Sequence, residues 1–90
     1  MKYAFRWRER AARQLRTVPQ PTALTILRAL TPLGDDPRRQ DADIKKLAGY
    51  SDRYRLRVGD YRVIYEIADA QLIILIVGVG HRRDAYHALS

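Results

Sequence analysis

The hydrophobic pattern of the chain changes period along its length, and each period predicts a different kind of element. Residues 2–7 alternate loosely and include three aromatic side chains, which predicts a short strand. Apolar residues then recur at helical spacing over residues 9–17. Prolines 19 and 21 interrupt this pattern, and Pro21 suits the first turn of a second helix. We therefore expect two helices joined by a short link, packed as an antiparallel hairpin.

The second helix is expected to end at Gly34. Its buried stripe should consist of the apolar residues at helical spacing: Leu24, Ile26, Leu27, Leu30 and Leu33. The polar residues 35–43 include Pro37 and predict a loop. Residues 43–49 bring the chain back to the sheet, with Ile44 and Leu47 as candidate anchors.

Residues 53–67 read as two strands joined by Gly59-Asp60. Glycine at the first position of a two-residue connection indicates a type II′ hairpin. With this turn, three cross-strand pairs fall on one face because strand side chains alternate. These pairs are Val58 with Tyr61, Leu56 with Val63, and Tyr54 with Tyr65.

The other face of the hairpin is strongly basic. Arg57 falls opposite Arg62, Arg55 opposite Ile64, and Arg53 opposite Glu66. Like charges directly across a sheet repel, whereas paired guanidinium groups match the oxygens of a phosphate. Two interpretations stay open, which are a polyanion-binding face and the solvated outer face of a basic protein.

Residues 72–79 form a continuous aliphatic run, which is typical of a strand buried on both faces. We expect it to end at Gly80 and to pair with the strand 61–67, since sequential strands usually neighbour each other. Residues 81–87 should begin a short C-terminal helix. The fold class is α+β, in the order β-α-α-β-β-β, with an antiparallel-rich sheet. The helices pack on the Leu56/Val63 side, leaving the arginines open.

Composition narrows the class of protein. The 90 residues form a single domain over 1–90, with a formal net charge of +7 and no cysteine. The charge favours nucleic acid or an acidic protein as partner. No apolar run reaches the length of a membrane span, so we expect a cytoplasmic protein. No glycine-rich phosphate loop is visible, and the two histidines lack a carboxylate cluster, so we expect neither a cofactor nor a metal.

A second cluster, GHRRDAYH, follows the last strand. The arginine pair would then be bordered by His81, by Arg82 or Arg83, and by Tyr86. Such a group of cations, one imidazole and one phenol resembles a metal-free ribonuclease site. Arginines would stabilise the phosphorane formed by 2′-OH attack, and a histidine or tyrosine would move protons. Each residue also has a structural interpretation: a backbone-bound histidine, a packed tyrosine and solvated arginines. We assign no role to His87.

The chain resembles the RelE-type toxins of the RelE/ParE superfamily of toxin–antitoxin pairs. Three segments carry the resemblance: the basic-aromatic start with its helical hairpin, KKLAG followed by YRLRVGDYRVIYEI, and VGHRRDAY. Together they cover essentially the whole chain. RelE-type members enter the ribosomal A site and cut the mRNA there.

The resemblance suggests a site by position. The basic pair of the first hairpin strand is Arg55 and Arg57, and Tyr86 stacks on a base or assists proton transfer. The best-studied pattern has lysines at the basic pair, and arginine hardly acts as a base. We predict the catalytic residues to be Arg57, Arg62, His81, Arg82 and Tyr86. We predict RNA binding by Arg53, Arg55, Arg83, Lys45 and Lys46.

The resemblance also implies partners. These are the ribosome, mRNA and a cognate antitoxin, acidic and partly disordered, that wraps the toxin. Promoter DNA is expected to be bound only through the antitoxin complex. ParE-type members of the superfamily inhibit DNA gyrase without cutting RNA, and this alternative stays open beside the nuclease. A plain basic RNA-binding protein without toxicity is the third possibility.

Overall fold

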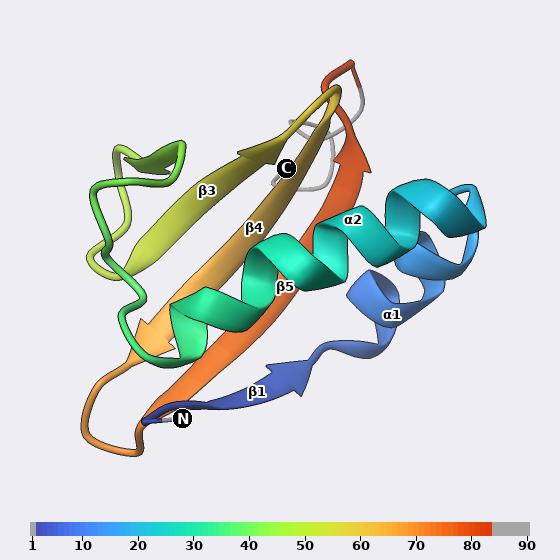
Figure 1. Cartoon of the computed structure of the whole chain (residues 1–90). Coiled ribbons are helices and arrows are strands. Elements are labelled where there is room, and N and C mark those ends of the chain that lie inside the picture. Colours follow the sequence, from blue (N-terminus) through green and yellow to red (C-terminus); the bar gives the residue numbers. More distant parts are fainter. Residues whose placement is uncertain (1, 84–90) are drawn as a thin grey trace.

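The computed structural model describes residues 2–83, and Figure 1 shows a small sheet crossed by two helices. Its elements in chain order are β1 (Ala4–Trp7), α1 (Glu9–Arg16), α2 (Gln20–Leu30), a 3-10 turn (Thr31–Gly34), β2 (Ile44–Lys46), β3 (Arg53–Val58), β4 (Tyr61–Ala68) and β5 (Ile73–His81). Within this range, no helix is both long and apolar enough to cross a bilayer.

The five strands form one sheet in the order β1-β5-β4-β3-β2. The pairs β2–β3, β3–β4 and β4–β5 are antiparallel, and β1 runs parallel to β5. The predicted α+β class with an antiparallel-rich sheet is confirmed. The predicted order lacked β2, which pairs with β3 through Ile44 and Leu56. Three residues are too few to show a strand period, so the pattern predicted only an anchoring segment there.

The β3–β4 hairpin has the predicted register at all six positions, from Arg53 opposite Glu66 to Val58 opposite Tyr61. Gly59 has a φ of +59°, and Asp60 is not among the residues with positive φ. A single positive φ at the first turn position is the pattern of a type II′ turn. Local turn chemistry therefore fixes which side chains share a face.

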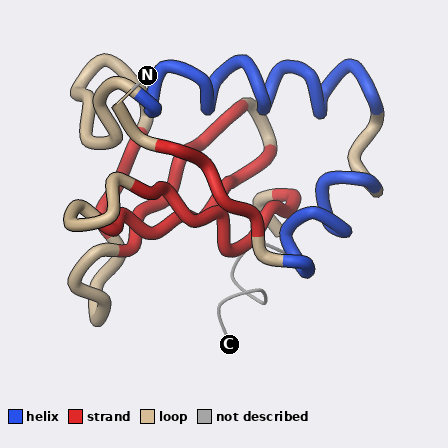
Figure 2. The backbone as a smooth tube through the Cα atoms, turned by 90° about the horizontal axis from the view of Figure 1, so that it is seen from below, coloured by secondary structure: helices blue, strands red, loops and turns tan. Residues whose placement is uncertain are grey.

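Both helices cover one side of the sheet, as Figure 2 shows from below. We call this side the helix face, and the side with Arg53, Arg55, Arg57 and Arg62 the arginine face. The helix face carries the core, in which Tyr65, Ile74 and Ile76 are fully buried. The ring of Tyr65 stacks on that of Tyr54 with 5.7 Å between centroids.

The predicted stripe of α2 is only partly correct. Ile26 and Leu30 are buried, and Leu33 follows them into the core from the 3-10 turn. Leu24 and Leu27 are instead 46% and 40% exposed. The helix rests on the sheet along Ile26 and Leu30, four residues apart. Leu24 and Leu27 therefore fall on the neighbouring side of the helix.

The strand β5 is less buried than we predicted, since we expected both of its faces to be covered. Ile73, Leu75 and Val77 are only half-buried, whereas Ile74 and Ile76 are fully buried. The helices cover only one side of the described sheet, and an aliphatic run does not distinguish one covered face from two. The predicted start of the C-terminal helix over 81–87 is wrong, because His81 is the last residue of β5. Residues beyond Arg83 lie outside the described part.

A β-bulge interrupts the pairing of β4 with β5. Ile64 pairs with Gly78, but the next residue, Tyr65, pairs with Ile76, which leaves Val77 as the extra residue. One extra residue reverses the alternation of side chains beyond it. Ile74 and Ile76 face the helices before the bulge, and Val79 faces them after it.

Candidate nucleic-acid interface

The end of the sheet at the 59–60 turn, which we call the hairpin end, brings the predicted phosphate-binding arginines together. Arg57 lies directly opposite Arg62 on the arginine face, and Arg62 lies opposite Gly80 on the other side. Arg57 is exposed, and its Nε donates to the carbonyl of Gly59 at 3.4 Å. Among residues 2–83, no carboxylate forms an ion pair with Arg57. Its positive charge is therefore available to an anion.

Arg82 is tied to the same end through its backbone. Its N–H donates to the carbonyl of Asp60 at 2.7 Å, and its own carbonyl lies 3.4 Å from Nη1 of Arg62. These contacts fix the turn after β5 beside the hairpin tip. Gly80 contributes no side chain next to Arg62. The arrangement places Arg57, Arg62 and the backbone of Arg82 around the tip of one hairpin.

The other two arginines of this face are paired with carboxylates. Arg53 donates to Glu66 at 2.7 Å and lies over the Tyr50 ring, 4.2 Å from its centroid. Arg55 donates to Asp43 at 2.8 Å, and its side chain is 15% exposed. Because both charges already have counter-charges, their predicted role in RNA binding requires exchange of a carboxylate for a phosphate.

The lysines of β2 point to opposite sides. Lys45 pairs with Arg55 and so lies on the arginine face, whereas Lys46 pairs with Tyr54 and lies on the helix face. Arg83 is exposed after β5, and its N–H lies 3.4 Å from Nδ1 of His81. The structure therefore brings Lys45 into line with the arginines and separates Lys46 from them.

His81 does not border the arginine face, so that expectation is wrong. It pairs with Tyr61, and the two rings meet edge to face with centroids 5.5 Å apart. The bulge at Val77 is the cause, since it turns Val79 and His81 toward the helices and Gly78 and Gly80 toward the arginines. Tyr86 lies outside the described residues, so its predicted place beside the arginines stays a prediction.

Sequence reasoning missed three residues that shape this end. Asp43 pairs with Arg55, and the carbonyl of Asp60 holds the Arg82 backbone. Gln14 accepts the N–H of Val79 at 2.8 Å through Oε1. A signal existed for Gln14 alone, because this polar residue lies at helical spacing between the buried Ala11 and Val18.

The opposite end of the sheet, which we call the acidic end, carries a different kind of cluster. The Oη of Tyr3 donates to Asp69 at 2.5 Å, and Arg38 binds the same carboxylate at 2.8 Å and the Tyr54 hydroxyl at 3.0 Å. Hydrogen bonds from Arg38 and Tyr3 lower the pKa of Asp69 to about 2. The hydrogen bond to Asp69 in turn raises the pKa of Tyr3. This network joins the residue before β1, the loop after α2, β3 and the β4–β5 turn.

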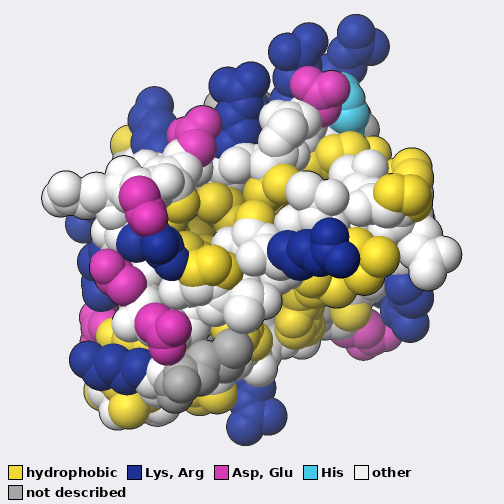
Figure 3. Space-filling view, in the orientation of Figure 1, with side chains coloured by type: hydrophobic (Ala, Val, Ile, Leu, Met, Phe, Trp, Pro, Cys, Tyr) yellow, Lys and Arg dark blue, Asp and Glu magenta, His cyan; other side chains and the backbone are white. Residues whose placement is uncertain are grey.

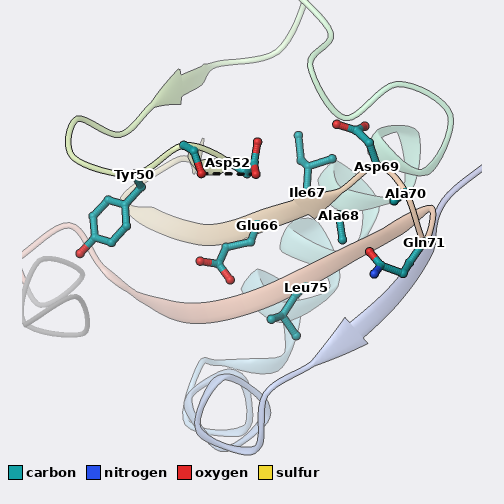
Figure 4. Close-up of a pocket in the computed structure, with 10 residues that line it drawn as sticks. Tyr50, Asp52, Glu66, Ile67, Ala68, Asp69, Ala70, Gln71 and Leu75 are labelled. Atoms are coloured by element: carbon teal, nitrogen blue, oxygen red, sulfur yellow. Dashed lines mark hydrogen bonds between the residues drawn. The ribbon is translucent and has the colours of Figure 1, made fainter.

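A cavity of about 590 Å³ lies at the acidic end (Figure 4). It is lined by Tyr50, Ser51, Asp52, Glu66, Ile67, Ala68, Asp69, Ala70, Gln71 and Leu75. Its three carboxylates have the wrong sign for a phosphate ligand. Among residues 2–83, no three His, Cys, Asp or Glu side chains form a group that could hold a metal ion. The arginines at the hairpin end are therefore the better candidate for an anionic ligand.

The comparisons with known proteins show that this small basic α+β fold is that of a toxin domain. A family model described as the ParE toxin of the type II toxin–antitoxin system parDE matches residues 5–86. The chain belongs to the RelE/ParE superfamily of type II toxins, and within it the relatives below identify a RelE-type toxin. The predicted resemblance is confirmed.

A putative RelE-like toxin protein of Escherichia coli is 32% identical over 100% of this chain and 96% of that protein. The mRNA interferase toxin RelE of Escherichia coli K12 is 27% identical over 91% of this chain and 85% of that protein. The archaeal RelE–RelB complex of Pyrococcus horikoshii contains a chain of the same fold, with a TM-score of 0.79 and 31% identity. That match covers 94% of this chain and all of the other.

Proposed function

We propose that this toxin is a ribosome-dependent endoribonuclease that cuts mRNA in the ribosomal A site and so blocks translation. The main observation behind this proposal is that Arg57 and Arg62 lie opposite each other on β3 and β4. The backbone of Arg82 is held beside them. The similarity to a protein named mRNA interferase supports the same reaction. Action on the ribosome implies a cytoplasmic protein.

Once the ribosome presents the mRNA, the bond-breaking step uses groups of the RNA and of protein side chains. The 2′-oxygen of the substrate attacks the adjacent phosphorus, a phosphorane forms, and the bond to the 5′-oxygen breaks to leave a cyclic phosphate. The 2′-OH loses a proton and the leaving 5′-oxygen gains one. Arg57, Arg62 and Arg82 stabilise the extra negative charge of the phosphorane, because guanidinium groups stay protonated and fit phosphate oxygens.

Proton transfer is assigned to Tyr86. Guanidinium groups stay protonated near neutral pH, so they cannot accept the proton of the 2′-OH. His81 lies beside Tyr61 on the helix face, away from Arg57 and Arg62. On the resemblance, Tyr86 is the remaining candidate, and replacing it by phenylalanine separates proton transfer from stacking. A stacking role predicts nearly normal cleavage by this variant.

An antitoxin is the second partner we propose. The family is named for a toxin–antitoxin system, and the Pyrococcus horikoshii relative was solved as a RelE–RelB complex. The net charge of +7 favours an acidic partner. The edge strands β1 and β2 leave backbone groups to which an extended peptide segment can pair. Promoter DNA would be bound only through that complex.

Primer extension on an mRNA in a purified translation system tests the nuclease, with and without ribosomes. We expect cuts at A-site positions that require the ribosome. Intact mRNA, beside a control toxin that cuts, would contradict the nuclease. Loss of DNA supercoiling by gyrase in a parallel assay would then identify a ParE-type toxin. Normal growth on expression would instead favour an RNA-binding protein without toxicity.

A further inference from the structure

The two carboxylate-bound arginines of the arginine face are held in different ways. Glu66 lies opposite Arg53 on β4 and accepts from both its Nε and its Nη2, at 3.0 and 2.7 Å. The ring of Tyr50 lies against the same guanidinium group. Arg53 is thus bound along one whole edge and covered by a ring. An incoming phosphate would have to break two hydrogen bonds to reach it.

Arg55 uses only half of the same edge. Its Nη2 donates to Asp43 at 2.8 Å, whereas its Nε is buried and has no hydrogen-bond partner among residues 2–83. The side chain of Asp43 is 57% exposed, against 32% for that of Glu66. A single hydrogen bond to a water-exposed carboxylate is weak, because water competes for both groups. Asp43 is therefore the more easily displaced of the two carboxylates.

The backbone places Asp43 beside the phosphate-binding pair. The N–H of Arg57 donates to the carbonyl of Asp43 at 2.9 Å, next to the pairing of Ile44 with Leu56. Because Asp43 directly precedes Ile44, its side chain falls on the arginine face by alternation. An acidic group of this chain thus occupies a guanidinium group next to the proposed cleavage site.

The spacing of Arg55 and Arg57 suits two neighbouring phosphates. They lie two residues apart on the same face of β3, which is about 7 Å along a strand. Consecutive phosphates of an extended RNA strand have a similar spacing. A strand whose phosphate lies between Arg57 and Arg62 can therefore place its next phosphate at Arg55. Lys45, which lies opposite Arg55 on β2, adds a second positive charge at that point.

We propose that Arg55 and Lys45 form a second phosphate site for the RNA strand and that Asp43 closes this site in the free toxin. The carboxylate takes the place of a phosphate until RNA held at Arg57 displaces it. The closed state lowers the affinity for RNA by the cost of releasing Asp43. The proposal rests on the nuclease function and deepens it, and Asp43 takes no part in bond cleavage.

Binding of a short labelled RNA with 2′-O-methyl groups tests the site, because such a strand cannot be cut by its own 2′-oxygen. One added phosphate contact contributes about 0.7 to the slope of log K against log salt concentration, or about fivefold in affinity at 0.1 M salt. We expect Asp43→Asn to show both changes in fluorescence anisotropy. The backbone carbonyl that binds Arg57 is kept in this variant, and circular dichroism checks its fold.

Asp41→Asn is the matched control. Asp41 lies in the same loop before β2 and binds Arg39 through two hydrogen bonds, at 2.5 and 2.6 Å. Its loss changes the net charge equally but releases an arginine outside the arginine face, so the affinity should change less than about twofold. Adding Arg55→Ala to Asp43→Asn should abolish the gain. Equal gains in the two asparagine variants, or a gain that persists without Arg55, would overturn the proposal.

The wild-type toxin provides a second measurement. The Nε–H signal of Arg55 should move in NMR spectra when RNA is added, because a phosphate binds both N–H groups of this edge. The Nε–H signal of Arg53 should move much less, since Glu66 already binds it. A stationary Arg55 signal would overturn the proposal.

These measurements are independent of cleavage. A toxin that leaves mRNA intact on the ribosome but shows the expected slopes would keep the phosphate site and lose the nuclease function. A toxin that cuts mRNA but shows the same slope with and without Asp43 would keep the nuclease function and lose the closed site.

Discussion

The two ends of the sheet use the same kinds of side chain for different purposes. At the acidic end, Arg38 is bound to Asp69 and Arg53 to Glu66. At the hairpin end, Arg57 lies opposite Arg62. Among the described residues, no carboxylate forms an ion pair with Arg57. In Figure 3, blue and magenta side chains alternate at the lower left, whereas blue ones predominate along the upper edge, with a few magenta ones among them.

The contrast between the two ends separates charges that hold the fold together from charges that are candidates for binding a ligand. An arginine bound to a carboxylate stabilises a connection between elements, and its charge is largely cancelled for a distant ligand. An arginine facing another arginine weakens the sheet slightly, because like charges across strands repel. A phosphate bound between two facing guanidinium groups would offset this repulsion. Whether an arginine lies beside a carboxylate therefore says more about its role than the total number of arginines does.

The largest expected effect is on cleavage. Arg62→Ala should lower the cleavage rate by about 10²–10³-fold, as for loss of one preorganised donor to a transition-state charge. Arg53→Ala, on the same face but four residues from Arg57 and opposite Glu66, should retain cleavage within a few fold. Rates come from primer extension on programmed ribosomes, and circular dichroism confirms that both variants fold. Similar rates for the two variants would remove the functional distinction between the ends.

Next in size is a loss of stability from Tyr65→Phe. The buried Tyr65 hydroxyl donates to the carbonyl of Pro37 at 2.8 Å and fixes the loop before β2. Losing this hydrogen bond should cost about 1 kcal/mol. In a domain of this size that lowers the Tm by about 4–8 °C. Thermal unfolding measures it, and cleavage per folded molecule should stay unchanged. An unchanged Tm would show that this anchor does not stabilise the fold.

A smaller effect concerns the salt dependence of RNA binding. Each charge that neutralises a phosphate of single-stranded RNA contributes about 0.7 to the slope of log K against log salt concentration. Arg57→Ala should reduce the slope by about this amount. Arg55→Ala should reduce it less, because Arg55 is already paired with Asp43. Fluorescence anisotropy of a short labelled RNA over a salt series gives both slopes, and equal reductions would contradict the distinction.

The smallest effect is the pH dependence at the acidic end. The folded pKa of Asp69 lies at about 2, below its ordinary value of 3.8. Its ionised form therefore stabilises the fold above about pH 4, and this contribution is lost as the pH falls toward 2. Asp69→Asn should be slightly less stable at pH 7 and should lose less stability between pH 5 and pH 3. Melting curves at the two pH values check this, and parallel losses would contradict it.

The hairpin was predictable because its information is local. Alternating side chains and the Gly59-Asp60 turn determine the register from Arg53 to Glu66, and the structure reproduces it. The two helices and the antiparallel pairing of β5 with β4 followed from period and chain order. These features depend on residues close in sequence, so one sequence contains enough information to place them.

The remaining features depend on contacts between distant segments. β2 is three residues long and exists through its pairing with β3. Leu24 and Leu27 have the helical period of a buried stripe, but the line of contact with the sheet selects Ile26 and Leu30. The ion pairs of Arg53 and Arg55 decide which arginines are available, and the pairing of Asp43 with Arg55 had no signal in the sequence pattern.

The bulge at Val77 also bears on how this toxin can evolve. It allows one strand to present Ile74 and Ile76 to the core at one end and glycines to the arginines at the other. Deleting the codon of Val77 alone would remove the bulge and restore strict alternation, while Gly78 stays opposite Ile64 and Val79 opposite Val63. Both ends of β5 would keep their faces, and the glycines would still lie beside the arginines. The bulge is therefore a point at which β5 can lose one residue in evolution without exchanging its core side for its arginine side.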